Sequence, residues 1–144
     1  MDTRKLGNFG EKIAENYLRN KGYQILDRNY FFRIPGSPKK GEIDVVAKKS
    51  DIISFIEVKT LRTPDSPISP EEKVDFGKQR KLVKTAESWL MKKKIPLNSK
   101  WQIDVIAIKI DSNTRAIAKG EEEDLSSSPK KVEISHFENA ISYA

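Results

Sequence analysis

The residues best suited to chemistry are charged side chains that interrupt two apolar stretches. The first stretch reads Gly41-Glu42-Ile43-Asp44-Val45-Val46, and the second contains Glu57-Val58-Lys59. Side chains of an extended strand alternate between two faces, so Glu57 and Lys59 point to one side and Val58 to the other. The spacing therefore predicts a carboxylate and an ammonium group side by side on one face of a strand.

The two stretches are separated by a short polar segment that predicts a hairpin. If the chain turns tightly at Ser50-Asp51, Asp44 stands opposite Glu57 and Glu42 stands opposite Lys59, all on one face. A shift of one residue would put Asp44 and Glu57 on opposite faces. On the other face the same register pairs three sets of residues that can pack against a helix: Ile43 with Val58, Val45 with Ile56, and Ala47 with Ser54.

Two carboxylates so close together repel unless a positive charge lies between them. Oxygen ligands from Asp44, Glu57 and the carbonyl group of Val58 suit a hard divalent cation, Mg²⁺ or Mn²⁺. Such an ion polarises a phosphodiester and lowers the pKa of a bound water. Lys59 would then orient that water or stabilise the charge developing on the phosphate. The pattern predicts metal-dependent phosphodiester hydrolysis.

A salt-bridged polar stripe on a half-exposed hairpin would contain the same three residues, Asp44, Glu57 and Lys59. However, the strong apolar flanks indicate that both faces of these strands are covered. A charged stripe in a covered sheet is costly without a metal or other partners. We therefore favour the metal site over the polar stripe.

The helices and strands that must position these residues are predicted from the spacing of apolar residues and from the glycines and prolines that interrupt it. Apolar spacing and turn residues predict two helices, four strands and a proline- and glycine-containing loop. The helices are expected over Leu6 to Lys21, stopped by Gly22, and from Ser69-Pro70 to about Lys93; the strands over Tyr23 to Arg33, Glu42 to Ala47, Ile52 to Thr60 and Trp101 to Ile110; the loop over Ile34 to Lys40.

A chain of 144 residues is about the length of one domain. We expect a single α/β domain, residues 1–144, whose mixed sheet is flanked by helices and whose core spans about 7–110. A polar excursion, 111–131, follows, with a short strand near Ala116 to Ala118. The last segment, 132–144, regains apolar residues and is expected to pack as a short strand and helix.

Composition narrows the class of protein. The chain has no cysteine, which excludes disulfides, thiolate zinc sites and cysteine nucleophiles. Lysine and arginine number 27 against 21 acidic residues, a net charge of +6, with a pI near 9.4. This balance favours a polyanionic partner such as nucleic acid. No signal peptide or membrane-spanning run is evident, so a cytoplasmic location is expected.

The second predicted helix is rich in basic residues. These basic residues are expected to follow a phosphate backbone, with Arg80, Lys84 and Lys73 along one side, although a merely solvated basic face would show the same residues. The set comprises Lys73, Lys78, Arg80, Lys81, Lys84 and Lys92 to Lys94. Asp104 interrupts the last predicted strand and is expected to pair with a lysine. His136, the single histidine, is interpreted as structural.

A longer set of residues resembles a known family. The set comprises Gly10-Glu11, Ala14, Tyr17-Leu18, Gly22-Tyr23, Asn29, Gly41-Glu42-Ile43-Asp44, Phe55-Ile56-Glu57-Val58-Lys59, Lys78-Gln79, Leu82, Ala86, Trp89-Leu90 and Asp104-Val105. In this set the chain resembles the YraN-like family of small uncharacterised bacterial proteins, placed in the PD-(D/E)xK nuclease-like superfamily. The layout is also similar to archaeal Holliday junction resolvases.

The resemblance implies a restriction endonuclease-like αβββαβ core. It implies a Mg²⁺-dependent endonuclease acting on DNA, including branched or structured DNA, and a catalytically inactive nucleic-acid-binding module of the same fold stays the alternative. Glu11 matches a helix glutamate that helps complete the metal site, against a plain N-terminal helix carboxylate. Lys78 and Gln79 fall where such nucleases place residues near the scissile phosphate. Resolvase-like cutting of two strands favours a homodimer.

Overall fold

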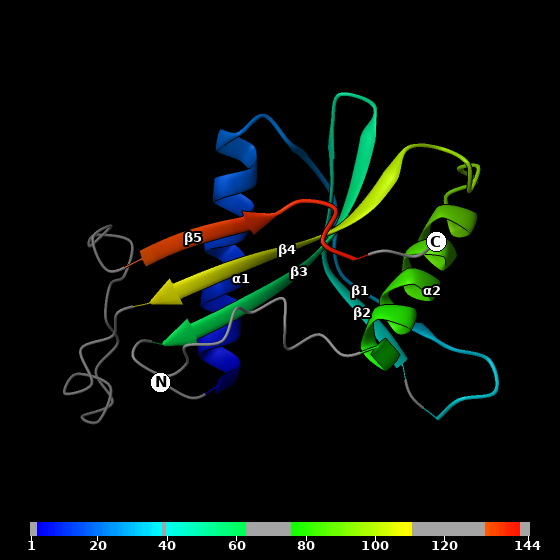
Figure 1. Cartoon of the computed structure of the whole chain (residues 1–144), viewed down its shortest axis with the longest axis horizontal. Helices are drawn as coiled ribbons and strands as arrows, with labels where there is room; N and C mark the ends of the chain where they lie inside the picture. The colour runs from blue at the N-terminus through cyan, green and yellow to red at the C-terminus, as the bar shows by residue number, and fades with distance from the viewer. Residues whose placement is uncertain (1–2, 39, 63–75, 111–131, 142–144) are drawn as a thin grey trace.

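The computed structural model describes residues 3–38, 40–62, 76–110 and 132–141, which form two helices and five strands (Figure 1). The described helices do not include one long and apolar enough to span a lipid bilayer. In chain order the elements are α1 (Thr3–Asn20), β1 (Gln24–Arg33), β2 (Lys40–Lys49), β3 (Ile52–Arg62), α2 (Phe76–Lys92), β4 (Trp101–Ile110) and β5 (Val132–Phe137).

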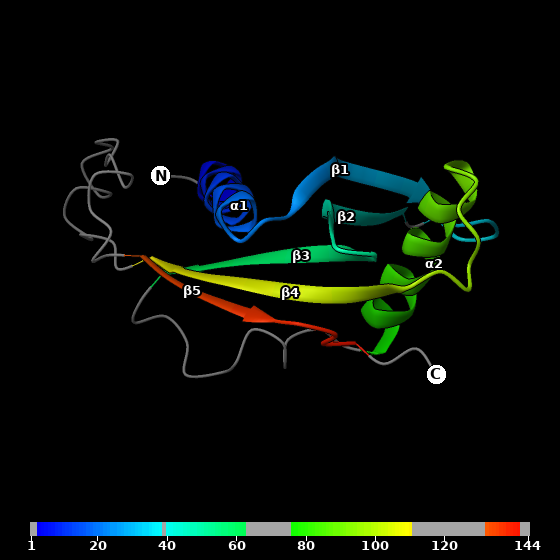
Figure 2. The same ribbon diagram turned by 90° about the horizontal axis from the view of Figure 1, so that it is seen from above.

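The five strands form one mixed sheet whose spatial order is the chain order, β1-β2-β3-β4-β5. Neighbouring strands are antiparallel except β3 and β4, which are parallel. A parallel pair needs a crossover connection, and α2 lies within the connection between β3 and β4. Figure 2 shows α1 over one end of the sheet and α2 at the opposite end.

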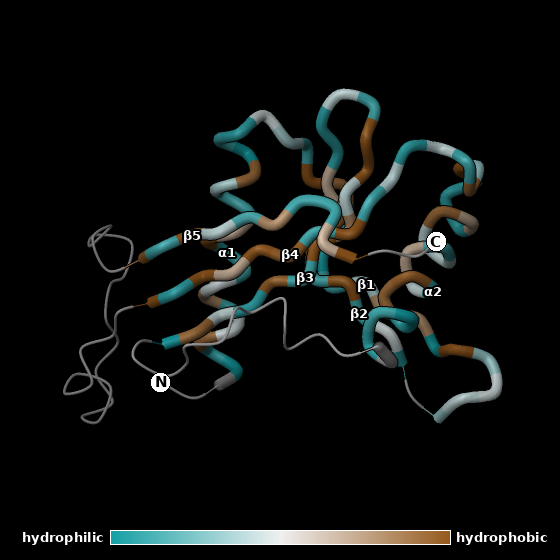
Figure 3. Tube along the Cα trace, in the orientation of Figure 1, coloured by the Kyte–Doolittle hydropathy of each residue, from teal (hydrophilic) through white to brown (hydrophobic). Residues whose placement is uncertain are grey.

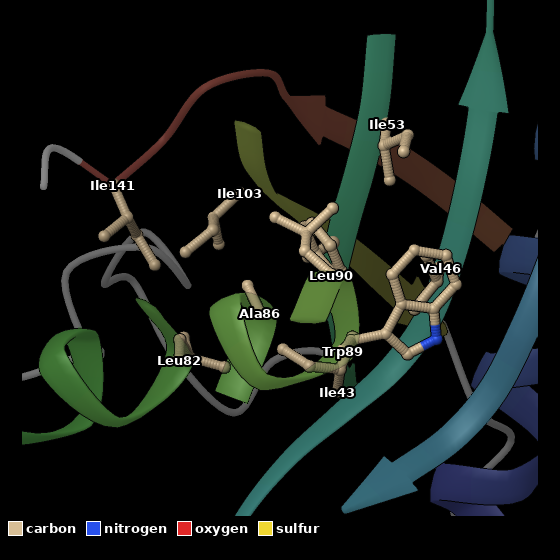
Figure 4. Close-up of a cluster of buried hydrophobic side chains, with 10 residues drawn as sticks. Ile43, Val46, Ile53, Leu82, Ala86, Trp89, Leu90, Ile103 and Ile141 are labelled. Atoms are coloured by element: carbon tan, nitrogen blue, oxygen red, sulfur yellow. The ribbon is translucent and has the colours of Figure 1, made fainter. Parts of the chain in front are cut away.

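Two apolar clusters on opposite faces of the sheet hold the helices in place. One cluster packs under α2 (Figure 4). Within it Phe55 and Trp89 meet edge to face with ring centroids 5.5 Å apart. The other packs under α1 and includes Ala14 and Leu18. Along β4, Ile103 belongs to the first cluster and Ile106 to the second. Burial on both faces explains the long hydrophobic runs of β3 and β4 (Figure 3).

A glycine just after α1 ends the helix. Gly22 adopts φ +92°, a left-handed conformation that costs glycine little. The amide of Tyr23 donates to the Leu18 carbonyl at 2.9 Å, and the amide of Gly22 donates to the Arg19 carbonyl at 3.0 Å. This pair of bonds is a Schellman cap, which satisfies the last carbonyl groups of the helix. The predicted stop at Gly22 is confirmed.

The predicted element order and α/β class are confirmed, and the layout is compatible with a restriction endonuclease-like core. The last segment forms the expected strand, β5, but its described residues 138–141 continue as a turn and not as a helix. The expected helix start at Ser69-Pro70 and the short strand near Ala116 to Ala118 lie outside the described residues.

Candidate functional site

The hairpin register predicted from the sequence is confirmed where β2 and β3 pair. Val45 stands opposite Ile56 and Ala47 opposite Ser54, and the pairing ends at Val45. Beyond this point the amide of Val58 donates to Asp44 Oδ2 at 2.7 Å. A carboxylate thus takes the place of a strand carbonyl, so β2 and β3 separate at the residues that carry the predicted chemistry.

Two details of the predicted hairpin face are wrong. Ile43 packs with Val46 in the cluster under α2, whereas Val45 belongs to the cluster under α1. The strict alternation of side chains therefore breaks at Asp44, where the ladder between the strands ends. Glu42 does not stand opposite Lys59 in the ladder, because the pairing of β2 with β3 ends at Val45. Instead Glu42 is exposed and forms an ion pair with Lys40 at 3.1 Å.

Two glycines let both helices approach the hairpin closely. A Cβ atom on Gly10 of α1 would collide with the side chain of Thr60 on β3. A Cβ atom on Gly41 of β2 would collide with Thr85 of α2. Glycine at these positions therefore brings Glu11, the next residue of α1, to one side of the site and α2 to the other.

The carboxylate of Glu57 is bound by two ammonium groups. Its Oε1 atom lies 3.1 Å from Lys59 Nζ and 3.0 Å from Lys78 Nζ, and Glu57 itself is only 9% exposed. Glu57 and Lys59 thus share one face of β3, as predicted. Lys78 reaches the same oxygen from α2. Burial and the neighbouring Lys78 ammonium lower the pKa of Lys59.

Asp44 and Glu11 form a second acidic pair. Burial and the nearby charge of Glu57 raise the pKa of Asp44 to about 8, and Asp44 shares a hydrogen bond with Glu11. Burial raises the pKa of Glu11 too, together with repulsion from Glu15 and Glu57. Burial and mutual repulsion therefore favour a proton shared between Asp44 and Glu11 near neutral pH. Glu11 lies close to Asp44 and Glu57, as predicted.

These residues open onto a cleft of about 880 Å³ between the β1–β2 connection and the first half of α2. Asp44 and Glu57 lie at its wall. Gln79, predicted near the phosphate, is not among the described residues that line the cleft. Its basic lining residues are Lys40, Lys78, Arg80, Lys81 and Lys84.

One of these basic residues, Lys40, had no place in the sequence prediction. For the helix residues a signal was present, since Lys78, Lys81 and Lys84 follow at three-residue spacing on one helix. Lys73 lies outside the described residues. Lys40 has no such signal, because only the pairing of β1 with β2 brings the β2 start to the cleft.

The donor set of the site fits a hard divalent cation. Asp44 and Glu57 supply carboxylate oxygens, the atoms that Mg²⁺ and Mn²⁺ prefer. The repulsion that raises the pKa of Asp44, and the two ammonium groups on Glu57, mark a place where positive charge is stabilised. A bound cation would compete with the proton on Asp44 and with the lysine ammonium groups on Glu57. Asp44 must lose its proton, and Glu57 must release one of its lysine partners, before the two carboxylates can bind the ion.

A second polar cluster lies around Asp104, which is fully buried on β4. Its partner is His136 of β5, with Nε2 2.8 Å from Oδ2, so the expectation that Asp104 pairs with a lysine is wrong. The Tyr17 hydroxyl lies 3.1 Å from His136 Nδ1. Gln102 and the amide of Asn139 each donate to Oδ1 of Asp104 at 2.9 Å.

This cluster, the Asp104–His136 network, joins α1, β4 and β5. In the described part of the chain, Asp104, His136 and Glu138 are the one group of three side chains whose possible ligand atoms lie within 4.8 Å of one another. Each oxygen of Asp104 and both ring nitrogens of His136 already have protein partners. The structural interpretation of His136 therefore agrees with its contacts, and the network fastens β5 to the rest of the molecule.

Comparison with known proteins identifies the relatives of the chain. Residues 10–108 match a family described as "Uncharacterised protein family UPF0102". A UPF0102 protein of Clostridium tetani is 48% identical over 93 residues, covering 65% of this chain and 70% of the relative. A UPF0102 protein of Clostridium botulinum (strain Loch Maree) is 41% identical over 110 residues, covering 76% of this chain and 84% of the relative.

The matched range contains Glu11, Asp44, Glu57, Lys59 and every basic residue that lines the cleft. The match agrees with the resemblance to YraN-like proteins that the sequence motifs indicate. The chain therefore belongs to the UPF0102 family of uncharacterised proteins.

Proposed function

We propose that this protein is a Mg²⁺- or Mn²⁺-dependent endonuclease that hydrolyses phosphodiester bonds of DNA in the cytoplasm. One observation carries the proposal. The carboxylates of Asp44 and Glu57 lie at the wall of a cleft whose other charged lining residues are mostly cations, and the ammonium of Lys59 lies 3.1 Å from Glu57. Acidic ligands for a metal at the wall of a basic cleft suit a polyanionic substrate whose backbone must meet a cation.

Each residue of the site has a separate task in this proposal. Asp44, Glu57 and the carbonyl group of Val58 would hold the ion, and Glu11 would complete the acidic side of the site. When bound, the ion supplies Lewis-acid activation of the phosphate and of a water. Lys59, whose pKa is lowered, lies 3.1 Å from Glu57 and can orient that water and stabilise negative charge on the phosphate.

The cations along α2 bind the rest of the substrate. Lys78 bridges from Glu57 toward the cleft, while Arg80 and Lys84 are exposed along its wall. Such contacts position a phosphate backbone without reading sequence. They accommodate branched or structured DNA as well as a plain duplex, and a homodimer would place two such sites for cuts on two strands.

The first experiment is calorimetric titration of Mn²⁺ and Mg²⁺ into the wild type and Asp44→Ala, followed by cleavage assays on labelled DNA. We expect about one ion per chain, and loss of both binding and cleavage in Asp44→Ala and Glu57→Ala, with DNA affinity retained. Asp51→Asn is the matched control, since Asp51 is an exposed carboxylate that pairs with Lys100. Unchanged cleavage by both alanine variants would refute the assigned site.

A second function has its own support. Without any ion, the proton on Asp44 and the lysines on Glu57 already neutralise the site. That state suits a module that binds nucleic acid and does not cut it. No metal binding in the presence of duplex DNA, together with intact DNA affinity, would favour this inactive binding module over the nuclease.

A further inference from the structure

An exposed aromatic ring lies beside the cleft. Phe31 of β1 is 57% exposed, and its position in the register is directly opposite Glu42 of β2. Directly opposite residues of an antiparallel pair share a face of the sheet. Glu42 and Lys40 both line the cleft, so Phe31 extends that wall on the edge strand of the sheet.

The ring of Phe31 has a defined neighbour. Lys40 Nζ lies 5.2 Å from the ring centroid and 3.1 Å from Glu42 Oε1. Tyr30, the preceding residue, points the other way, since its hydroxyl lies 2.8 Å from Ser88 Oγ of α2. The packing of α2 thus uses Tyr30 and leaves Phe31 to solvent. The ring of Phe31 is therefore an exposed aromatic surface beside the basic residues of the cleft.

The position of Phe31 relative to the acidic site can be derived from strand geometry. Glu42 and Asp44 are two residues apart on β2, about 6.7 Å along the strand, and β1 lies about 4.8 Å to the side. The Cα atoms of Phe31 and Asp44 are therefore about 8 Å apart. That distance is comparable with the size of one nucleotide, so a base next to a phosphate at Asp44 can reach the ring.

We infer that Phe31 is a stacking platform for an unpaired base, and hence that the preferred substrate contains a single-stranded or splayed-out nucleotide. The inference rests on the proposed function for the position of the neighbouring phosphate. A base inside a duplex has both faces covered by its neighbours, whereas an unpaired base offers a free face. Stacking on an aromatic ring tolerates any base, because every base has a π face. The cations of the cleft supply the matching contacts to the backbone.

The test measures binding by fluorescence anisotropy without divalent metal. The probes are a labelled single-stranded oligonucleotide and a blunt duplex of the same length, each in a deoxyribose and a ribose version. We compare the wild type with Phe31→Ala and Phe31→Trp. Met91→Ala is the matched control, since Met91 is an exposed apolar residue of α2 that does not line the cleft.

Phe31→Ala is expected to weaken single-strand binding about tenfold and duplex binding by less than about twofold. Phe31→Trp should retain single-strand affinity, and Met91→Ala should change neither. Equal loss on both probes, no loss on either, or no binding of nucleic acid by the wild type would overturn the inference. Tighter binding of the ribose probe would identify RNA as the source of the unpaired base.

The outcome is separable from that of the proposed function, because the binding assay contains no metal and no cleavage. Selective loss in Phe31→Ala, combined with absent cleavage in the wild type, would refute the nuclease and leave the stacking platform. Metal-dependent cleavage by the wild type, combined with unaltered single-strand binding by Phe31→Ala, would refute the stacking platform and leave the nuclease.

Discussion

At the scale of single residues, Asp44 is held in an environment that opposes its charge. Its neighbours explain this, since Glu57 and Glu11 both lie close and the site is largely buried. Sites that bind ions or substrates commonly store unfavourable electrostatics of this kind, which ligands relieve. The sequence could predict the proximity of Asp44 and Glu57 from register, but not the proton shared with Glu11, which depends on how α1 packs.

The first prediction concerns Asp44→Asn in the metal-free protein. The pKa of Asp44 rises on folding from 3.8 to about 8, so its contribution to stability is fully present below about pH 4 and is lost as the pH rises to about 8. The amide cannot ionise and keeps an acceptor for the Val58 amide. At pH 8 the variant should be more stable by about 2 kcal/mol, less than the full shift implies because the cleft admits water.

Urea denaturation of the wild type and Asp44→Asn at several pH values measures this effect. The difference between the two proteins should shrink toward pH 4, where both side chains are neutral. A difference that is constant with pH would contradict the assigned environment of Asp44, and Asp51→Asn, a change at an exposed carboxylate, controls for loss of a surface charge.

The second prediction concerns Lys78, whose ammonium lies 3.0 Å from Glu57. In the proposed function an arriving cation must displace this ammonium from the carboxylate. Lys78→Met should therefore tighten Mn²⁺ binding about fivefold, a change of about 1 kcal/mol. Calorimetry measures it, with Lys81→Met as a control that also removes a cation from the cleft wall. Weaker Mn²⁺ binding in Lys78→Met would show that Lys78 supports the site and does not compete with the ion.

At the scale of elements, local signals predicted more than long-range ones. The tight turn and the alternation of apolar residues were enough to predict the β2–β3 register. The break at Asp44 could not be predicted, because a side chain replaces a backbone partner there. Nor could the Asp104–His136 network, whose members Tyr17 and His136 are 119 residues apart in the chain. No periodic pattern connects residues so distant.

The third prediction concerns the Asp104–His136 network. His136→Ala removes a hydrogen-bond partner from a fully buried carboxylate and also removes the hydrogen-bond partner of the Tyr17 hydroxyl. Breaking such a buried pair should destabilise the protein by about 3 kcal/mol. Ser135→Ala, a change to the neighbouring half-buried residue of β5, is the control. A loss in His136→Ala no larger than in the control, measured by urea denaturation, would show that the network contributes little to stability.

At the scale of the whole molecule, part of the positive charge behind the net charge of +6 is concentrated around the cleft. Composition indicated a polyanionic partner but not where it would bind, because lysines occur throughout the chain. Among the described residues, the packing of α2 beside the β1–β2 connection gathers four lysines and one arginine around the same cleft as the two site carboxylates. Basic residues that are spread along the sequence are therefore brought to one cleft only by folding.

The fourth prediction concerns how the affinity for DNA depends on salt concentration when basic residues of α2 are removed. If Arg80 and Lys84 each neutralise one phosphate, Arg80→Ala and Lys84→Ala should each reduce the slope of log Kd against log salt concentration by about 1. Lys100→Ala, which removes an exposed cation that pairs with Asp51, should leave the slope unchanged. Anisotropy titrations of duplex DNA at several salt concentrations measure the slopes. Equal slopes for all three variants would indicate diffuse attraction with no defined track along α2.

The order of the strands bears on how the molecule is made. In the described part of the chain, each strand after β1 pairs with the strand that precedes it, and every residue of the proposed metal site lies in the first 59 positions. During synthesis each new strand can therefore add to an existing edge without waiting for a distant partner. The β1–β2–β3 meander, with its acidic residues, can assemble while α2, β4 and β5 are still to come. The residues of the proposed cation site would then come together in newly made chains before the core that covers β3 is closed.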